Sequence, residues 1–217
     1  MTNTDSTLLV FLLDRSGSMQ SIKDDVEGAF SAYIEDQRKV GGSATVSLHQ
    51  FDDRYEDVYL DRPLAEVRPL QLRPRGSTAL LDAMGRTITA TRERIAALPE
   101  DRRPGTVHFN IMSDGHENAS REFTRPAIRR MVEAQEKADN WLVAYMGCDQ
   151  DAVEIGAALG VSADRSLTFT RDTVVSAMAS VSAMTTSARD TRRAGASMDE
   201  LRAASAFSAD QRRDAGE

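Results

Sequence analysis

The stretch that decides the fold is LLVFLLDRSGSM, residues 8–19. Six apolar residues run without a break from Leu8 to Leu13, which is typical of a strand covered on both faces in the middle of a parallel sheet. The run ends at Asp14, and Ser16 and Ser18 follow at alternate positions. Hard cations such as Mg2+ prefer oxygen ligands of this kind in a compact arrangement. The stretch therefore predicts a central strand with a metal site at its carboxyl end.

Two later segments supply further oxygen ligands. Thr78 precedes a helical stretch, and Asp114 follows a second apolar strand, VHFNIM at residues 107–112. In doubly wound sheets ligands bind in a crevice outside the carboxyl ends of the strands, and both Asp14 and Asp114 fall at such ends. An alternative interpretation is that Asp14 and Ser18 only cap a helix and that Asp114 begins an ordinary turn.

The order Asp-x-Ser-x-Ser, then Thr, then Asp resembles the metal-ion-dependent adhesion site of the von Willebrand factor A domain family, over roughly residues 6–170. The resemblance implies that Mg2+, or Mn2+ in its place, is held by five side chains: Asp14, Ser16, Ser18, Thr78 and Asp114. It implies direct binding by the two serines, direct binding by Thr78 or Asp114 according to conformational state, and binding through water by Asp14. One coordination position is then left for an Asp or Glu carboxylate of a protein partner. The mostly neutral hydroxyls favour such an anion, because they leave the cation much of its charge.

Composition limits the classes of partner and compartment. The 217 residues include 27 basic and 34 acidic ones, and the net charge of -7 argues against binding to nucleic acid or to an anionic membrane. A single cysteine, Cys148, excludes an internal disulfide and fits a reducing compartment. The N-terminal stretch lacks the basic residues of a secretory signal, and no segment approaches the roughly 20 apolar residues of a membrane span. We therefore expect a cytoplasmic protein with a protein partner.

Hydrophobic periodicity predicts the remaining elements. Helices are expected at residues 21–38, after Thr78, at 124–138 and at 152–159, and further strands at 44–51, 55–60, 141–146 and around 167–169. The short link between residues 51 and 55 indicates an antiparallel hairpin. Strands that alternate with helices predict an α/β fold: a doubly wound, mostly parallel, Rossmann-like sheet with one antiparallel edge strand and helices on both faces.

The chain is expected to divide into three parts. Residues 1–171 form one domain of the von Willebrand factor A type, and residues 172–188 form a C-terminal helix docked on it. Residues 189–217 have few large apolar side chains, so we predict a disordered tail there. Docking of a short part of this segment on a partner or on the domain is the alternative.

These features together predict a Mg-dependent protein-binding module and not an enzyme. A Mg-dependent hydrolase or phosphatase acting in the same crevice is the alternative, because Mg2+ with an open position can activate water. Phosphatases of the haloacid dehalogenase type, however, need a second Asp two residues after the first, and here that position is Ser16. The crevice loops also lack a lysine, and the chain has no phosphate-binding loop ending in Lys-Ser or Lys-Thr.

The lesser candidates receive plainer interpretations. His116 and Glu117 are expected to be exposed loop residues, with contact to a partner as the alternative. Asp149 or Asp151 is expected to cap a helix. His49 and His108 lie in separate strands without a nearby cysteine, so they do not support a zinc site.

Overall fold

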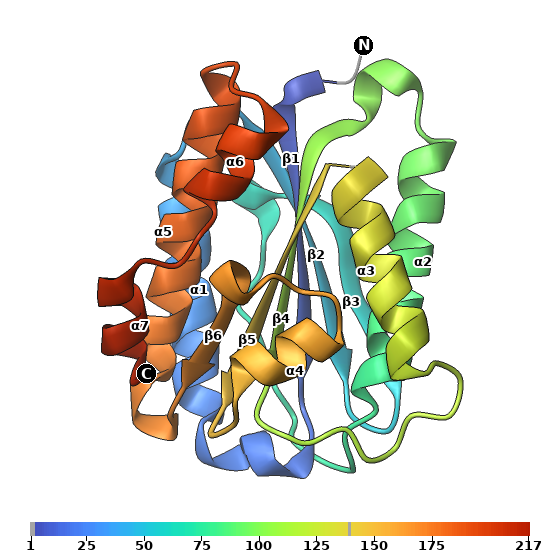
Figure 1. The fold of residues 1–217 in the computed structure, drawn as a ribbon, viewed down its shortest axis with the longest axis vertical. Helices are drawn as coiled ribbons and strands as arrows, with labels where there is room; N and C mark the ends of the chain where they lie inside the picture. The colour runs from blue at the N-terminus through green and yellow to red at the C-terminus, as the bar shows by residue number, and fades with distance from the viewer. Residues whose placement is uncertain (1–2, 139) are drawn as a thin grey trace.

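The computed structural model describes residues 3–138 and 140–217, and six strands form one sheet in the order β3-β2-β1-β4-β5-β6 (Figure 1). The strands are β1 (Asn3–Asp14), β2 (Ser43–Phe51), β3 (Tyr55–Pro63), β4 (Pro104–Ser113), β5 (Trp141–Cys148) and β6 (Ser166–Phe169). Every neighbouring pair is parallel except β2 with β3, which forms the antiparallel hairpin at one edge. The predicted sheet is therefore confirmed, with β1 near its centre.

Helices cover both faces of this sheet (Figure 1). One face carries α1 (Lys23–Lys39) and α5 (Val174–Arg193), and the other carries α2 (Leu80–Ala97), α3 (Arg125–Ala138) and α4 (Ala152–Ala158). Two short helices, α6 (Met198–Ala204) and α7 (Ala209–Ala215), pack against α5. Single 3-10 turns lie at Gly17–Ser21, Leu64–Glu66, Glu100–Arg102, Ala163–Arg165 and Arg171–Thr173. Of the described helices, none combines the length and the apolar character that a membrane crossing needs.

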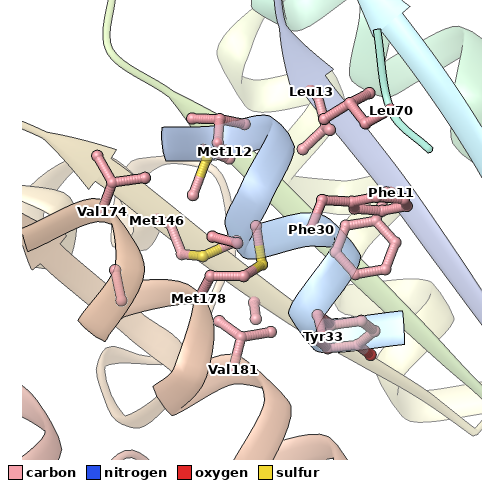
Figure 2. Close-up of a cluster of buried hydrophobic side chains, with 14 of the residues drawn as sticks. Phe11, Leu13, Phe30, Tyr33, Leu70, Met112, Met146, Val174, Met178 and Val181 are labelled. Carbon is pink, nitrogen blue, oxygen red and sulfur yellow. The ribbon is translucent and has the colours of Figure 1, made fainter. Parts of the chain in front are cut away.

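Strand β1 contributes to two separate cores, one on each face of the sheet. Leu9, Phe11 and Leu13 point into the core under α1 and α5, whereas the alternate residues from Leu8 to Leu12 point into the core under α2 and α3. Phe11 makes edge-to-face contacts with two aromatic rings of α1, at centroid distances of 5.1 and 4.8 Å (Figure 2). Because side chains alternate along a strand and both faces are covered, every residue of the run must be apolar.

The segment 189–217, for which we predicted a disordered tail, is helical and docked in the structure. Ser197 and Ser208 are the N-caps of its two short helices, and each forms a capping box. Leu201 and Phe207 are buried, and arginines of the segment donate to backbone carbonyls of the domain. The prediction counted apolar residues and neglected the caps and side-chain hydrogen bonds, each of which contributes about 1 kcal/mol.

Polar side chains of β4 are buried on the face that α1 and α5 cover. Thr106, His108 and Asn110 each have a buried polar atom without a hydrogen-bond partner among the described residues. Burial, together with the positive charges of Arg189 and Arg165, lowers the pKa of His108 to about 3. The imidazole is therefore neutral in the folded protein at neutral pH.

This neutral imidazole predicts a pH dependence of stability. In the unfolded chain a histidine protonates near its usual pKa of about 6.5, so the stability held by neutral His108 is complete above that pH and is lost as the pH falls toward 3. We expect the free energy of unfolding to fall by up to about 1.4 kcal/mol per pH unit from this residue. In urea denaturation, the free energy of unfolding of His108→Asn should fall less steeply with decreasing pH than that of the wild type between about pH 6.5 and 4.5.

The control for this measurement is Thr106→Val, which alters the same face of β4 without removing a titrating group. This variant should change the free energy of unfolding but keep its wild-type dependence on pH. A pH dependence left unchanged by His108→Asn would contradict the burial of a neutral imidazole.

A second prediction concerns the docked C-terminal segment. The fully buried Leu201 lies against Leu142 and Ala188. We expect Leu201→Ala to lower the free energy of unfolding by about 2–5 kcal/mol, because it removes buried methyl groups and leaves a cavity. The exposed Asp214→Ala in the same segment should stay within about 0.5 kcal/mol of wild type. Equal effects of the two changes in urea denaturation would mean that the segment is not docked.

Candidate metal centre

The register of the sheet brings the two predicted carboxylates to one edge. β1 and β4 are parallel neighbours, with Leu13 opposite Met112. Asp14 is the last residue of β1 and Asp114 follows β4 directly. Parallel neighbours in this register end side by side, so both carboxylates lie over the carboxyl edge of the sheet, where doubly wound folds bind ligands.

Four of the five predicted residues form a continuous chain of polar contacts. Asp14 Oδ1 accepts a hydrogen bond from Ser16 N at 2.7 Å, and Asp14 Oδ2 accepts one from Ser113 Oγ at 2.6 Å. The hydroxyl oxygens of Ser16 and Ser18 are 3.0 Å apart. Ser18 Oγ donates to Asp114 Oδ1 at 2.6 Å. The loops after β1 and β4 therefore meet through their side chains.

Thr78, the fifth predicted residue, enters the same crevice beside Gly115. A Cβ atom added at Gly115 would lie 2.6 Å from Thr78 Oγ1 and 3.5 Å from Ser16 Oγ. Thr78 is held in place by Asn118, whose Oδ1 accepts from Thr78 N at 3.0 Å and whose backbone N donates to Thr78 O at 3.0 Å. The structure thus brings all five predicted residues together, and only glycine fits between the hydroxyls.

The donor atoms of this crevice are two carboxylates and three hydroxyls. Within residues 3–138 and 140–217, no group of three or more His, Cys, Asp or Glu side chains is placed to hold a metal. The crevice is a different kind of site, because three of its five ligand side chains are neutral hydroxyls. Asp114 Oδ2 is buried and has no hydrogen-bond partner among the described residues. A buried carboxylate oxygen without a partner is costly, so the residues present fit a small, hard cation.

The two carboxyl groups titrate above their usual range. Burial raises the pKa of Asp14 to about 6; hydrogen bonds from Ser113 and Ser16 partly offset this effect, and the charge of Asp114 adds to it. Burial also raises the pKa of Asp114, against the hydrogen bond of Ser18 and the charge of Arg171. Both ionised carboxylates are thus disfavoured in the bare crevice, and a nearby cation would favour them.

Asp52, which the sequence interpretation overlooked, ties the crevice loops together. Its Oδ2 accepts from Arg15 Nε at 3.0 Å and from Arg75 Nε at 2.7 Å, and its side chain is 0% exposed. The backbone of Arg15 accepts from Arg75 N at 2.9 Å and donates to Phe51 O at 2.7 Å. Burial acts to raise the pKa of Asp52, but these hydrogen bonds and charges outweigh it and hold the pKa below its usual range. One buried carboxylate therefore anchors the loops that carry Ser16 and Thr78.

Arg171 lies at the rim of the crevice near Asp114 and was not predicted. It lies in the 3-10 turn after β6. Its Nε donates to Asp149 Oδ2 at 3.0 Å, its Nη1 donates to Ser21 Oγ, and its Nη2 is 3.9 Å from Asp114 Oδ2. The only feature of the sequence that could have indicated Arg171 is its place just beyond the carboxyl end of the short strand predicted around residues 167–169.

The lesser candidates lie as follows. Asp151 caps α4 as predicted, since its Oδ1 accepts from Glu154 N at 2.8 Å. His116 is exposed, as expected, whereas Glu117 is partly buried and its Oε1 accepts from the backbone N of Ala119 and Ser120. His49 and His108 lie on β2 and β4, and His49 Nδ1 is 2.6 Å from Asp57 Oδ1.

Several solved structures share this fold. A von Willebrand factor type A protein from Catenulispora acidiphila matches with a TM-score of 0.57 and 16% identity, over 84% of this chain and 43% of that chain. The vWF domain of a type V pili tip protein from Porphyromonas gingivalis matches with a TM-score of 0.56 and 10% identity, over 81% and 93%. Proximal thread matrix protein 1 from the mussel byssus matches with a TM-score of 0.54 and 15% identity, over 83% and 46%.

These similarities define the fold of the chain. Its six-stranded sheet and flanking helices form a fold like that of von Willebrand factor A domains. The chain spans less than half the length of the matching proteins from Catenulispora and mussel. No family model and no curated protein matches the sequence.

The close approach at Gly115 gives a third prediction. Gly115→Ala places a methyl group 2.6 Å from Thr78 Oγ1, so the loops carrying Thr78 and Asp114 must separate. We expect a loss of about 1–3 kcal/mol in the free energy of unfolding, as for other overpacked sites. Gly28→Ala is the control, because its added Cβ meets nothing within 4 Å and it lies in α1. It should raise stability by about 0.5–1 kcal/mol. Equal stability of the two variants in urea would contradict the close approach.

Proposed function

We propose that this chain is a Mg-dependent protein-binding module that captures an acidic group of a partner protein at the crevice. The observation that carries the proposal is the buried Asp114 Oδ2, which has no hydrogen-bond partner among the described residues and lies at the end of a row of hydroxyl oxygens. Mg2+, with Mn2+ possible, would be held by the five residues of the predicted set: Asp14, Ser16, Ser18, Thr78 and Asp114. The bound cation would supply an electrophilic position for an anionic oxygen.

Charge and exposure support capture of a carboxylate. Two carboxylates offset a dication only formally, and three of the five donors are neutral, so the loaded crevice favours an incoming anion. Asp14 and Ser16 are buried, whereas Ser18 is exposed. A partner would therefore approach from the side of Ser18. The half-exposed guanidinium of Arg171 adds positive charge at the same rim.

The alternative is a Mg-dependent hydrolase or phosphatase acting in the same crevice. Phosphatases of the haloacid dehalogenase type need a second Asp two residues after the first, in addition to the carboxylates that hold the metal. The position two residues after Asp14 is Ser16, whose Oγ lies 3.0 Å from Ser18 Oγ. We propose binding and not catalysis on the basis of this residue set.

The fourth prediction tests the metal site directly. MgCl2 should raise the thermal midpoint of the wild-type protein, and the rise should grow with concentration. At a Mg2+ concentration one hundred times the Kd, the gain in the free energy of unfolding is about 2.7 kcal/mol. Asp114→Asn and Ser18→Ala should each abolish most of this gain. The control, Asp101→Asn in the turn before β4, removes a carboxylate at the other end of the sheet and should keep it. The gain should also shrink as the pH falls through about 6, because Asp14 then binds a proton that the cation must displace.

Two measurements separate the two functions. A midpoint that does not respond to Mg2+ or Mn2+ in the wild type would refute the proposed metal site. Turnover of a phosphate ester by the Mg-loaded wild type, lost in Asp14→Asn, would show catalysis and overturn the proposal of a pure binding module.

A further inference from the structure

Arg171 has hydrogen-bonding capacity left over at the rim of the crevice. Its Nε and Nη1 are occupied by Asp149 and Ser21. The described residues give Nη2 no hydrogen-bond partner, and its 3.9 Å separation from Asp114 Oδ2 is longer than a hydrogen bond. The side chain is 46% exposed, while that of Asp114 is 0% exposed. The guanidinium is thus fixed at one edge and presents N–H donors at the other.

The orientation of Arg171 is built by the structure. Two contacts from different segments, one before α1 and one after β5, hold the guanidinium, so little side-chain freedom remains to be lost when it binds a ligand. Asp149 has a positive φ of 52°, a conformation that few residues other than glycine adopt, and its carboxylate holds Nε. Guanidinium groups are well suited to carboxylates, because their N–H donors match the geometry of the anion and the bonds are charge-assisted.

We propose that Arg171 is a second anchor for the acidic group, donating from Nη2 to the carboxylate that enters the crevice beside Asp114. This inference rests on the proposed function and extends it, because it assigns recognition of the anion to a residue outside the five metal-binding candidates. It also makes the crevice selective: a carboxylate can form a bond with Arg171 in which both partners are charged, whereas a neutral amide oxygen forms a weaker bond in which only the guanidinium is charged.

The charge of Arg171 should have opposite effects on the affinities for Mg2+ and for the carboxylate. A cation 3.9 Å from Asp114 Oδ2 disfavours a second cation there, so Arg171 weakens Mg2+ binding in the absence of an anion. The same charge strengthens binding of the carboxylate. If Arg171 only supported the loops, its removal would weaken the binding of both Mg2+ and the carboxylate. Opposite effects are therefore the signature of an anchor.

The fifth prediction uses Arg171→Gln and Arg171→Lys, with MgCl2 and sodium acetate as the probes and thermal denaturation as the readout. Sodium chloride at equal ionic strength is the reference for acetate. Arg171→Gln should bind Mg2+ roughly three- to tenfold more tightly at low ionic strength, and this gain should shrink with added salt. Its Mg-loaded form should bind acetate about tenfold more weakly. Arg171→Lys keeps the charge, so it should bind Mg2+ as the wild type does and acetate with intermediate affinity.

The matched control is Arg193→Gln. Arg193 is 47% exposed and donates to Asp190 at 3.0 Å, which closely reproduces the pairing of Arg171 with Asp149. It lies at the end of α5, away from the crevice loops, and its replacement should leave both affinities at wild-type values.

Each result has a defined meaning. Wild-type acetate affinity in Arg171→Gln, or weaker binding of both Mg2+ and acetate, would overturn the role of Arg171 and leave the metal site standing. A wild type that does not respond to Mg2+ would instead overturn the proposed function.

Discussion

The crevice depends on the hydrogen bond between Ser113 Oγ and Asp14 Oδ2, 2.6 Å long, which joins the ends of β1 and β4. The two strands are parallel and in register, so their carboxyl ends coincide and the loops that follow them begin at the same height. A shift of one residue in that register would turn Asp14 to the opposite face of the sheet. The apolar residues that precede Asp14 prevent such a shift, because each belongs to a core on its own face.

Around this hydrogen bond the crevice balances two opposed tendencies. Burial disfavours charge on Asp14 and Asp114, while their hydrogen bonds from serine hydroxyls favour it. Asp52 shows the other solution to the same problem, since two arginines neutralise it completely. The carboxylates of the crevice lack such cations within hydrogen-bonding distance, with Arg171 the nearest at 3.9 Å among the described residues. The structure therefore stabilises charge where it builds the loops and leaves it under-compensated where a ligand would bind.

Much of the architecture was predictable from local patterns. The continuous apolar run before Asp14 and the alternation of strands with helices were enough to place β1 centrally and to give the mostly parallel sheet. The five candidate residues were predictable because their order along the chain resembles a known metal-site pattern, and because Asp14 and Asp114 fall at the carboxyl ends of strands, where topology dictates position. Asp52, Ser113 and Arg171 were not, because their contacts join loops that are distant along the chain. The C-terminal segment was misjudged for a related reason: the docking of Leu201 and Phe207 depends on surfaces that only the folded domain provides.

The anchoring of the crevice by Asp52 differs in kind from the anchoring of the sheet. The strands are held by buried hydrocarbon, whose contribution varies little with ionic strength, whereas the loops around Asp14 and Thr78 are held by ion pairs with two guanidinium groups, one of them more than half exposed. Guanidinium chloride competes with these pairs chemically, while urea carries no charge. In the two denaturants the loops and the sheet should consequently come apart in different order, and a protein that keeps its far-UV spectrum in dilute guanidinium can already have lost the geometry of its crevice.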